Sequence, residues 1–157
     1  MINSSPDQSP KDELTTTLSL SALRAVNAKA KTEEILSLLS ESEIGILNQL
    51  DLNAAMLIVL SGPGKGSRYL LDTSSISIGR DASSSIFLDD VTVSRKHAVI
   101  TLEVNGGFTV EDQRSLNGTY VNGVSTKNTS LNFGDEIQIG KYRLTFLKSI
   151  NVKGERE

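Results

Sequence analysis

The chain of 157 residues contains no cysteine and no tryptophan, one histidine, and few aromatic residues of any kind (4%). Without cysteine it cannot form disulfides, thiolate nucleophiles or cysteine-based zinc sites, and this composition is typical of a reducing compartment. A single histidine, accompanied by no cysteine or second histidine, gives no basis for a metal cluster or a catalytic triad. The sequence therefore predicts no metal, no cofactor and no enzymatic activity.

Long hydrophobic segments and an excess of positive charge are also missing. The longest apolar run, residues 54–60, is far shorter than the roughly 20 residues that span a bilayer. The first residues have neither the basic start nor the apolar core of a secretory signal. The net charge is −3, whereas nucleic-acid-binding domains usually combine a basic surface with aromatic residues. We therefore expect a cytoplasmic protein that binds neither membranes nor nucleic acids.

What is present divides the chain into three parts, residues 1–53, 54–149 and 150–157. Residues 1–53 carry four basic and eight acidic side chains, and residues 1–31 have too few large apolar groups to offset the entropy of ordering. This part is predicted to be a flexible regulatory N-terminal arm. Within it, residues 32–50 predict two short helices, the second begun by a capping box from Ser40 to Glu43. Residues 150–157 are predicted to be a disordered C-terminal end.

Residues 54–149 show the pattern of a β domain. Short runs rich in Val, Ile, Leu, Phe and Tyr are separated by clusters of Gly, Asn, Asp and Pro, which are turn residues. The predicted strands are residues 56–60, 68–71, 75–78, 85–88, 98–103, 108–111, 119–121, 136–139 and 143–147. Many short strands with no long helical pattern among them indicate an all-β sandwich, which we expect to contain about eleven short strands.

Polar residues suited to an anion follow several of these strands. Arg80 offers a planar fork of donors that matches paired phosphate oxygens. Ser94 adds a neutral hydroxyl donor, and Arg95 or Lys96 adds a second positive charge. Asn117 is suited to hydrogen bonds with a peptide backbone. Because strand ends are rigid, these side chains are expected to form one anion receptor.

The order Gly79-Arg80, Ser94-Arg95-Lys96-His97 and Asn117-Gly118 resembles the forkhead-associated (FHA) domain, a phosphothreonine-binding β-sandwich, over about residues 56–147. This resemblance implies that Arg80 and Ser94 contact the phosphate, that Arg95 assists, and that Asn117 binds the peptide backbone. It implies support of the binding loops by Gly79, His97, Ser115, Gly118 and Thr119. Ser115 and Leu116 are expected to line the pocket for the residue three positions after the phosphothreonine.

Residues 86–95 and 115–122, preceded by a tail with adjacent threonines, resemble the small actinobacterial FHA regulators of the oxoglutarate dehydrogenase inhibitor or GarA group. This resemblance implies that the unphosphorylated protein, a monomer, binds and inhibits oxoglutarate dehydrogenase, with glutamate dehydrogenase as a second target. It implies that a serine/threonine protein kinase phosphorylates the tail, which then binds its own FHA domain and switches it off. The alternative is an adaptor that recruits other phosphothreonine proteins in trans.

The threonine cluster of the arm departs from the pattern of this group. Where the group shows Glu-Thr-Thr-Ser, residues 14–17 read Leu-Thr-Thr-Thr, so phosphorylation is open among Thr15, Thr16 and Thr17. Leucine lies three positions after Thr15 and Thr17, but serine lies three after Thr16, so selection of an apolar residue there disfavours Thr16. Treated as a flexible coil, the 38 residues from Thr16 to Ala54 span about 35 Å, enough to reach the domain.

Overall fold

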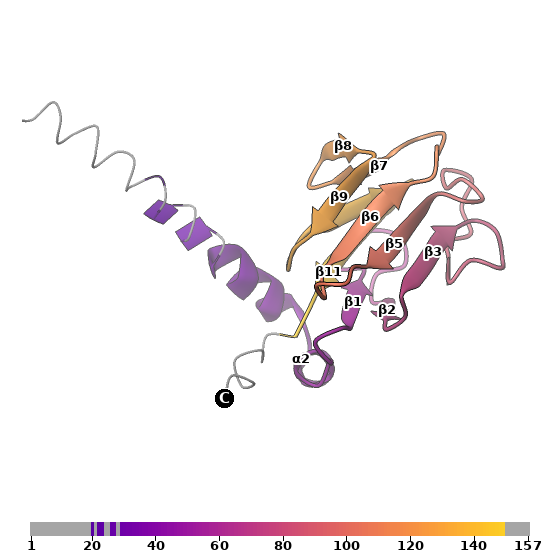
Figure 1. The fold of residues 1–157 in the computed structure, drawn as a ribbon. Helices are drawn as coiled ribbons and strands as arrows, with labels where there is room; N and C mark the ends of the chain where they lie inside the picture. The colour runs from indigo at the N-terminus through magenta and orange to yellow at the C-terminus, as the bar shows by residue number, and fades with distance from the viewer. Residues whose placement is uncertain (1–19, 21, 24–25, 28, 150–157) are drawn as a thin grey trace, which may run out of the picture. The chain divides into compact units, whose positions relative to one another are not determined.

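The computed structural model describes residues 20, 22–23, 26–27 and 29–149 (Figure 1). Eleven strands lie in this part of the chain: β1 (Ala55–Ile58), β2 (Arg68–Leu71), β3 (Ser75–Gly79), β4 (Ile86–Phe87), β5 (Ala98–Leu102), β6 (Phe108–Asp112), β7 (Thr119–Val121), β8 (Val124–Thr126), β9 (Asn128–Leu131), β10 (Glu136–Ile139) and β11 (Tyr142–Leu147). They form a six-stranded sheet, in the order β2-β1-β11-β10-β7-β8, and a five-stranded sheet, in the order β4-β3-β5-β6-β9. The predicted all-β sandwich is confirmed.

The hydrophobic core lies between the two sheets and follows from the alternation of apolar residues along the strands. On β10, for example, Ile137 and Ile139 are buried while Glu136 and Gln138 are half-exposed. Phe108 of β6 and Phe146 of β11 meet edge to face with their ring centroids 5.6 Å apart, so they join the two sheets directly. The sandwich is therefore a rigid base for the loops at its ends.

Two strands, β8 and β9, were absent from the strands assigned along the sequence. Their residues are mostly polar and exposed, and among them only Leu131 is buried. They are strands because they pair with neighbours, β8 with β7 and β9 with β6. Each lies at the edge of its sheet, where one side of the strand and much of its surface face water. Hydrophobic periodicity alone could not reveal them.

The chain divides into two compact units between Leu38 and Leu39, and the strands belong to the second. Residues 29–38 are helical in the first unit. The second unit begins with α2 (Glu41–Asn48), whose predicted capping box is present: Glu43 N–H donates to Ser40 Oγ and Ser40 N–H donates to Glu43. Leu47 is the buried residue of this helix.

These helices bear on the flexible-coil treatment of residues 1–53. The compact unit that contains the strands starts at Leu39, and the domain boundary at residue 54 stays a prediction. Since residues 29–38 and α2 are helical, the flexible-coil length does not hold for that segment. The threonines at 15–17 and the predicted C-terminal end at 150–157 lie outside the described residues. No helix of the described residues is long and apolar enough to cross a bilayer.

Strand pairing brings the predicted binding loops to one end of the sandwich. The end of β3 pairs with the start of β5, which pairs with the end of β6. In the other sheet, the start of β7 pairs with the end of β10. The loops at residues 80–85, 88–97, 113–118 and 140–141 therefore share one end, and all of the predicted phosphate-binding and peptide-binding side chains lie in them.

Candidate functional site

Gly79, the last residue of β3, allows two chain segments to touch. A Cβ at this position would lie 1.9 Å from the carbonyl oxygen of Arg95 and 3.1 Å from that of Ser94. The backbones are bonded there: Arg80 N–H donates to Ser94 O over 3.0 Å, and Asp81 N–H donates to Arg95 O over 3.3 Å. Only glycine fits this approach, which places Arg80 beside the loop that carries Ser94.

The half-buried Arg80 side chain is oriented by one hydrogen bond. Its Nε–H donates to the carbonyl oxygen of Val93 over 2.9 Å. Within the described part of the chain, the two terminal nitrogens of the guanidinium have no hydrogen-bond partner. Arg80 therefore presents two pre-oriented NH₂ groups to a ligand, which is the arrangement that binds paired phosphate oxygens.

Ser94 is positioned as a hydrogen-bond donor. Its Oγ accepts a hydrogen bond from Leu116 N–H over 3.0 Å. A hydroxyl has one proton in addition to its lone pairs, and the described residues provide no acceptor for the proton of Ser94. That proton is free for an anion. The same bond also fastens the loop at 113–118 to the loop at 88–97.

The His97 side chain also connects the loops at 88–97 and 113–118. It is fully buried. Its Nδ1 accepts from Ser94 N–H over 3.0 Å, which assigns the ring proton to Nε2, and Nε2 lies 2.9 Å from the carbonyl oxygen of Gly118. Both ring nitrogens are therefore used within the fold. This geometry fits the supporting role that the sequence predicted for His97.

Asp112, at the end of β6, organises the loop at 113–118. Its carboxylate accepts hydrogen bonds from Ser115 N–H, from Ser115 Oγ and from Thr119 Oγ1, the last over 2.7 Å. Ser115 Oγ in turn accepts from Gly118 N–H over 2.9 Å. Burial raises the pKa of Asp112, but the hydrogen bonds from Ser115 and Thr119 outweigh burial and leave the pKa below its ordinary value. The carboxylate stays ionised and holds the loop closed.

Asn117 projects from this loop next to the other binding residues. Its Nδ2 donates to the carbonyl oxygen of Thr92 over 2.9 Å, so the exposed side chain has a defined direction. The described residues provide no donor to its Oδ1, which can accept from the backbone N–H of a ligand. The following Gly118 has a φ of +83°, a backbone conformation that residues other than glycine rarely adopt.

The acidic residues near the site are engaged by neighbouring donors. A hydrogen bond from Ser83 N–H is the main reason why the pKa of Asp81 lies below its ordinary value. The hydroxyl and the N–H of Thr92 have the same effect on the pKa of Asp90. Arg95 and Lys96 are exposed. The described residues contain no group of three acidic or histidine side chains placed to hold a metal ion.

Comparisons with known proteins agree with this geometry. The model of the FHA domain family matches residues 76–140. The regulator named glycogen accumulation regulator GarA of Mycobacterium tuberculosis is 52% identical over 108 residues, which cover 69% of this chain and 66% of GarA. The oxoglutarate dehydrogenase inhibitor of Corynebacterium efficiens is 51% identical over 100 residues, which cover 64% of this chain and 70% of that protein. The chain belongs to the FHA-domain family.

A solved FHA structure, from a study of phosphothreonine-dependent FHA domain interactions, superposes with a TM-score of 0.55 at 30% identity. The superposition covers 60% of this chain and 95% of that chain. The resemblance to FHA proteins and to the GarA and oxoglutarate dehydrogenase inhibitor group is thereby confirmed.

A groove of about 320 Å³ continues from the FHA binding loops. Its described lining residues are Thr92, Asn117, Gly118, Tyr120, Gln138, Gly140 and Lys141. Neither Ser115 nor Leu116, which the sequence placed in a peptide-residue pocket, is among them. Ser115 Oγ is engaged with Asp112 and Gly118, and the Leu116 side chain is 89% exposed. The role of these two residues in a peptide-residue pocket stays a prediction.

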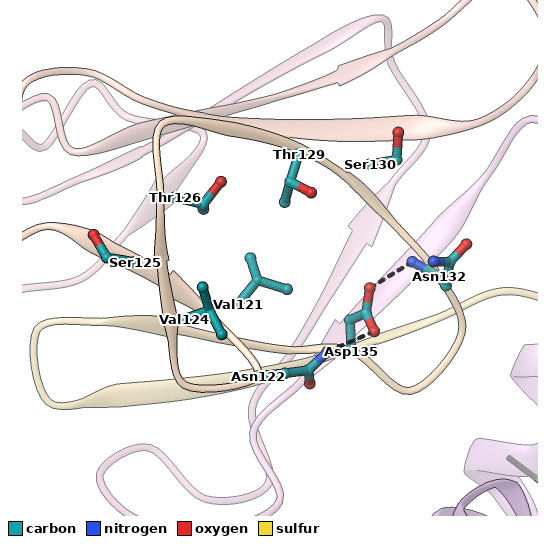
Figure 2. Close-up of a pocket in the computed structure, with 9 residues that line it drawn as sticks. All are labelled: Val121, Asn122, Val124, Ser125, Thr126, Thr129, Ser130, Asn132 and Asp135. Carbon is teal, nitrogen blue, oxygen red and sulfur yellow. Dashed lines mark hydrogen bonds between the residues drawn. The ribbon is translucent and has the colours of Figure 1, made fainter. Parts of the chain in front are cut away.

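A second cavity, of about 360 Å³, lies at the edge of the sandwich around β8 and β9 (Figure 2). Asp135 accepts hydrogen bonds there from Asn122 Nδ2 and from Asn132 N–H, so its carboxylate oxygens serve the local loops. None of the described residues that line it is cationic. This cavity is therefore unsuited to a phosphate dianion, and the loops around Arg80 are the better candidate.

Asp112 is one of the site residues that the sequence analysis missed, although its position three residues before Ser115 is typical of a carboxylate that caps a turn. We expect Asp112→Ala to lower phosphothreonine-peptide affinity about tenfold, because the loop bearing Asn117 loses three hydrogen bonds. Calorimetry with a phosphothreonine peptide measures this effect. Glu111→Ala, at the exposed neighbouring position, is the control, and equal affinities for the two variants would contradict the role of Asp112.

Proposed function

We propose that this FHA domain binds phosphothreonine peptides. Arg80 and Ser94 hold the phosphate, Arg95 adds positive charge, and Asn117 bonds to the peptide backbone. The observation that supports this assignment most strongly is the convergence of free donors from separate loops, since Arg80 and Ser94 are tied to each other by the Arg80 N–H to Ser94 O bond. Three charge-assisted hydrogen bonds, after ordering costs, correspond to micromolar affinity, about −8 kcal/mol.

We further propose that the chain is a non-enzymatic, cytoplasmic regulator that inhibits oxoglutarate dehydrogenase when it is unphosphorylated. Glutamate dehydrogenase is the second proposed target. The name of one relative, oxoglutarate dehydrogenase inhibitor, supports the first of these two targets. The binding loops also carry two strongly exposed apolar side chains, Val91 (87%) and Leu116 (89%), next to the cations. A mixed apolar and cationic surface of this kind suits a folded protein partner as well as a peptide.

Phosphorylation of the arm at Thr15, Thr16 or Thr17 by a serine/threonine protein kinase is proposed to close this site. A tethered phosphothreonine has an effective concentration on the order of millimolar, about a thousandfold above a micromolar dissociation constant. The phosphorylated arm would then occupy the FHA domain of its own chain almost completely. Because the arm and the target enzyme compete for one surface, inhibition stops.

Chemical shifts at low and high concentration separate this switch from an adaptor that acts in trans. The full chain is phosphorylated at one arm threonine, and the amide signals of Arg80, Ser94 and Asn117 are compared over about a tenfold dilution. The switch predicts bound-state shifts that do not depend on concentration, because the arm and the site belong to one molecule. An adaptor whose arm does not bind its own domain predicts shifts that return to those of the unphosphorylated chain.

The phosphorylated Arg80→Ala variant is the matched control. It retains the arm and its phosphate but lacks the guanidinium, so its site signals should equal those of unphosphorylated Arg80→Ala at every concentration. In parallel, the unphosphorylated chain should lower oxoglutarate dehydrogenase turnover, and the phosphorylated chain should not. Equal inhibition by both forms would contradict the switch.

A further inference from the structure

Among the described strands, β2 forms a free edge of the six-stranded sheet. Its residues alternate in direction, with Tyr69 half-buried and Leu71 buried toward the core. Arg68, Leu70 and Asp72 are exposed, and Leu70 keeps 54% of its surface in water. An unpaired edge with an exposed leucine at its centre is a surface that folded proteins usually protect.

Hydrogen bonding around Gly66 shows which backbone groups of β2 face outward. Gly66 N–H donates to Val59 O over 2.8 Å, and Val59 N–H donates to Ser67 O over 3.0 Å, which is the pattern of a bulge with a glycine at positive φ. Because backbone hydrogen bonds alternate along an antiparallel pair, the N–H and C=O groups of Tyr69 and Leu71, like the C=O of Ser67, point toward β1. The N–H and C=O groups of the residues at 68, 70 and 72 therefore point to the free edge.

A cavity of about 380 Å³ opens at the same edge, between β2 and the strands β3 and β4. Its described lining includes Arg68, Leu70 and Asp72 together with the buried Ile76 and Ile86. Phe87, next to Ile86, is 45% exposed. The edge thus combines unpaired backbone groups, accessible apolar surface and one charge of each sign at its two ends.

We propose that β2 pairs with β2 of a second copy of this chain, antiparallel, about a two-fold axis at Leu70. Residues 68 and 72 lie at equal distances from Leu70 on the same face. The symmetry therefore places Arg68 of each copy opposite Asp72 of the other and the two Leu70 side chains opposite each other. These are favourable cross-strand pairs, and the outward backbone groups at 68, 70 and 72 become mutually bonded. The charge pattern is self-complementary, as a two-fold interface requires.

Pairing of this kind gives a weak dimer. A four-residue strand buries less than the roughly 1,200 Å² typical of stable interfaces, so the dimer forms only at high concentration, while dilute protein is the monomer that the sequence predicted. Because the paired strands run in opposite directions, the FHA binding loops of the two copies point to opposite ends and stay open. The inference is independent of the phosphothreonine site.

Sedimentation velocity of the unphosphorylated full chain, from about 20 µM to about 1 mM, tests this proposal. We expect the mean mass to rise with concentration for the natural sequence and for Arg143→Asp, an exposed arginine on β11 that serves as the control. Arg68→Asp and Asp72→Arg should each self-associate at least about tenfold more weakly, because each places like charges opposite one another.

An equimolar mixture of these two variants restores both ion pairs across the axis, and so does the double variant R68D/D72R in a homodimer. Both samples should recover the association of the natural sequence. A chain that stays monomeric throughout the range overturns the proposal. An association that neither single variant weakens also overturns it. So does an association that the mixture and the double variant fail to restore.

Discussion

Arg80→Ala should lower the affinity for a phosphothreonine peptide by about a hundredfold or more. The guanidinium donates two charge-assisted hydrogen bonds in the proposed complex, each contributing roughly 1.5 to 3 kcal/mol. Its orientation is set in advance by the bond from Nε to Val93 O, so little entropy is lost on binding. Calorimetry with peptides of the arm, each phosphorylated at Thr15, Thr16 or Thr17, gives the affinity directly.

Two controls isolate the effect of the charge at this position. Arg143→Ala removes an exposed arginine from β11 and should leave the affinity unchanged. Thermal unfolding should show that Arg80→Ala keeps the fold, since the Arg80 backbone bond to Ser94 does not need the side chain. If Arg80→Ala bound the phosphopeptide with wild-type affinity, the phosphate would have to lie elsewhere.

Gly79→Ala is expected to destabilise the domain by more than about 3 kcal/mol and to abolish peptide binding. A new methyl group would lie 1.9 Å from the carbonyl oxygen of Arg95, a backbone atom that can move only if the whole 88–97 loop shifts. That shift would break the backbone bonds of Arg80 and Asp81 with this loop. Urea unfolding measures the stability, and calorimetry measures what binding remains.

Gly45→Ala is the matched control for this substitution. Gly45 lies in α2 with no neighbouring atom within 4 Å of an added Cβ, so the same chemical change should stabilise the helix by up to about 1 kcal/mol. Equal unfolding free energies for Gly79→Ala and the natural sequence would contradict the close approach that positions Ser94 next to Arg80.

Most of the fold could be predicted from local patterns in the sequence. Strands such as β10 alternate buried and half-exposed residues, and α2 begins with a complete capping box. Edge strands are harder to predict, because β8 and β9 are defined by pairing with β7 and β6, and their residues are mostly polar and exposed. The extent of the compact unit was also not predicted: it includes α2, in which Leu47 is buried.

For the site too, residues in a local sequence pattern could be predicted, whereas contacts between distant segments could not. Arg80, Ser94 and Asn117 were identified because they occur in a fixed order after short strands. Asp112 and Thr92 were not identified. The spacing of Asp112 from Ser115 is a local signal that was overlooked, whereas the carbonyl oxygen of Thr92 accepts from Asn117 in another loop, a contact that only the fold reveals. Only the structure explains why residue 79 must be glycine, because the atom that a side chain would meet is the carbonyl oxygen of Arg95, which is distant in sequence.

The central claim is that Arg80, Ser94 and Asn117 form one receptor for phosphothreonine. The most direct measurement is an NMR titration of the unphosphorylated chain with a phosphothreonine peptide and with the same peptide lacking phosphate. We predict that only the phosphorylated peptide shifts the backbone signals at these three residues, and that its effect disappears in Arg80→Ala. Shifts confined to the cavity around Asn122 and Asp135, or identical responses to both peptides, would contradict the account.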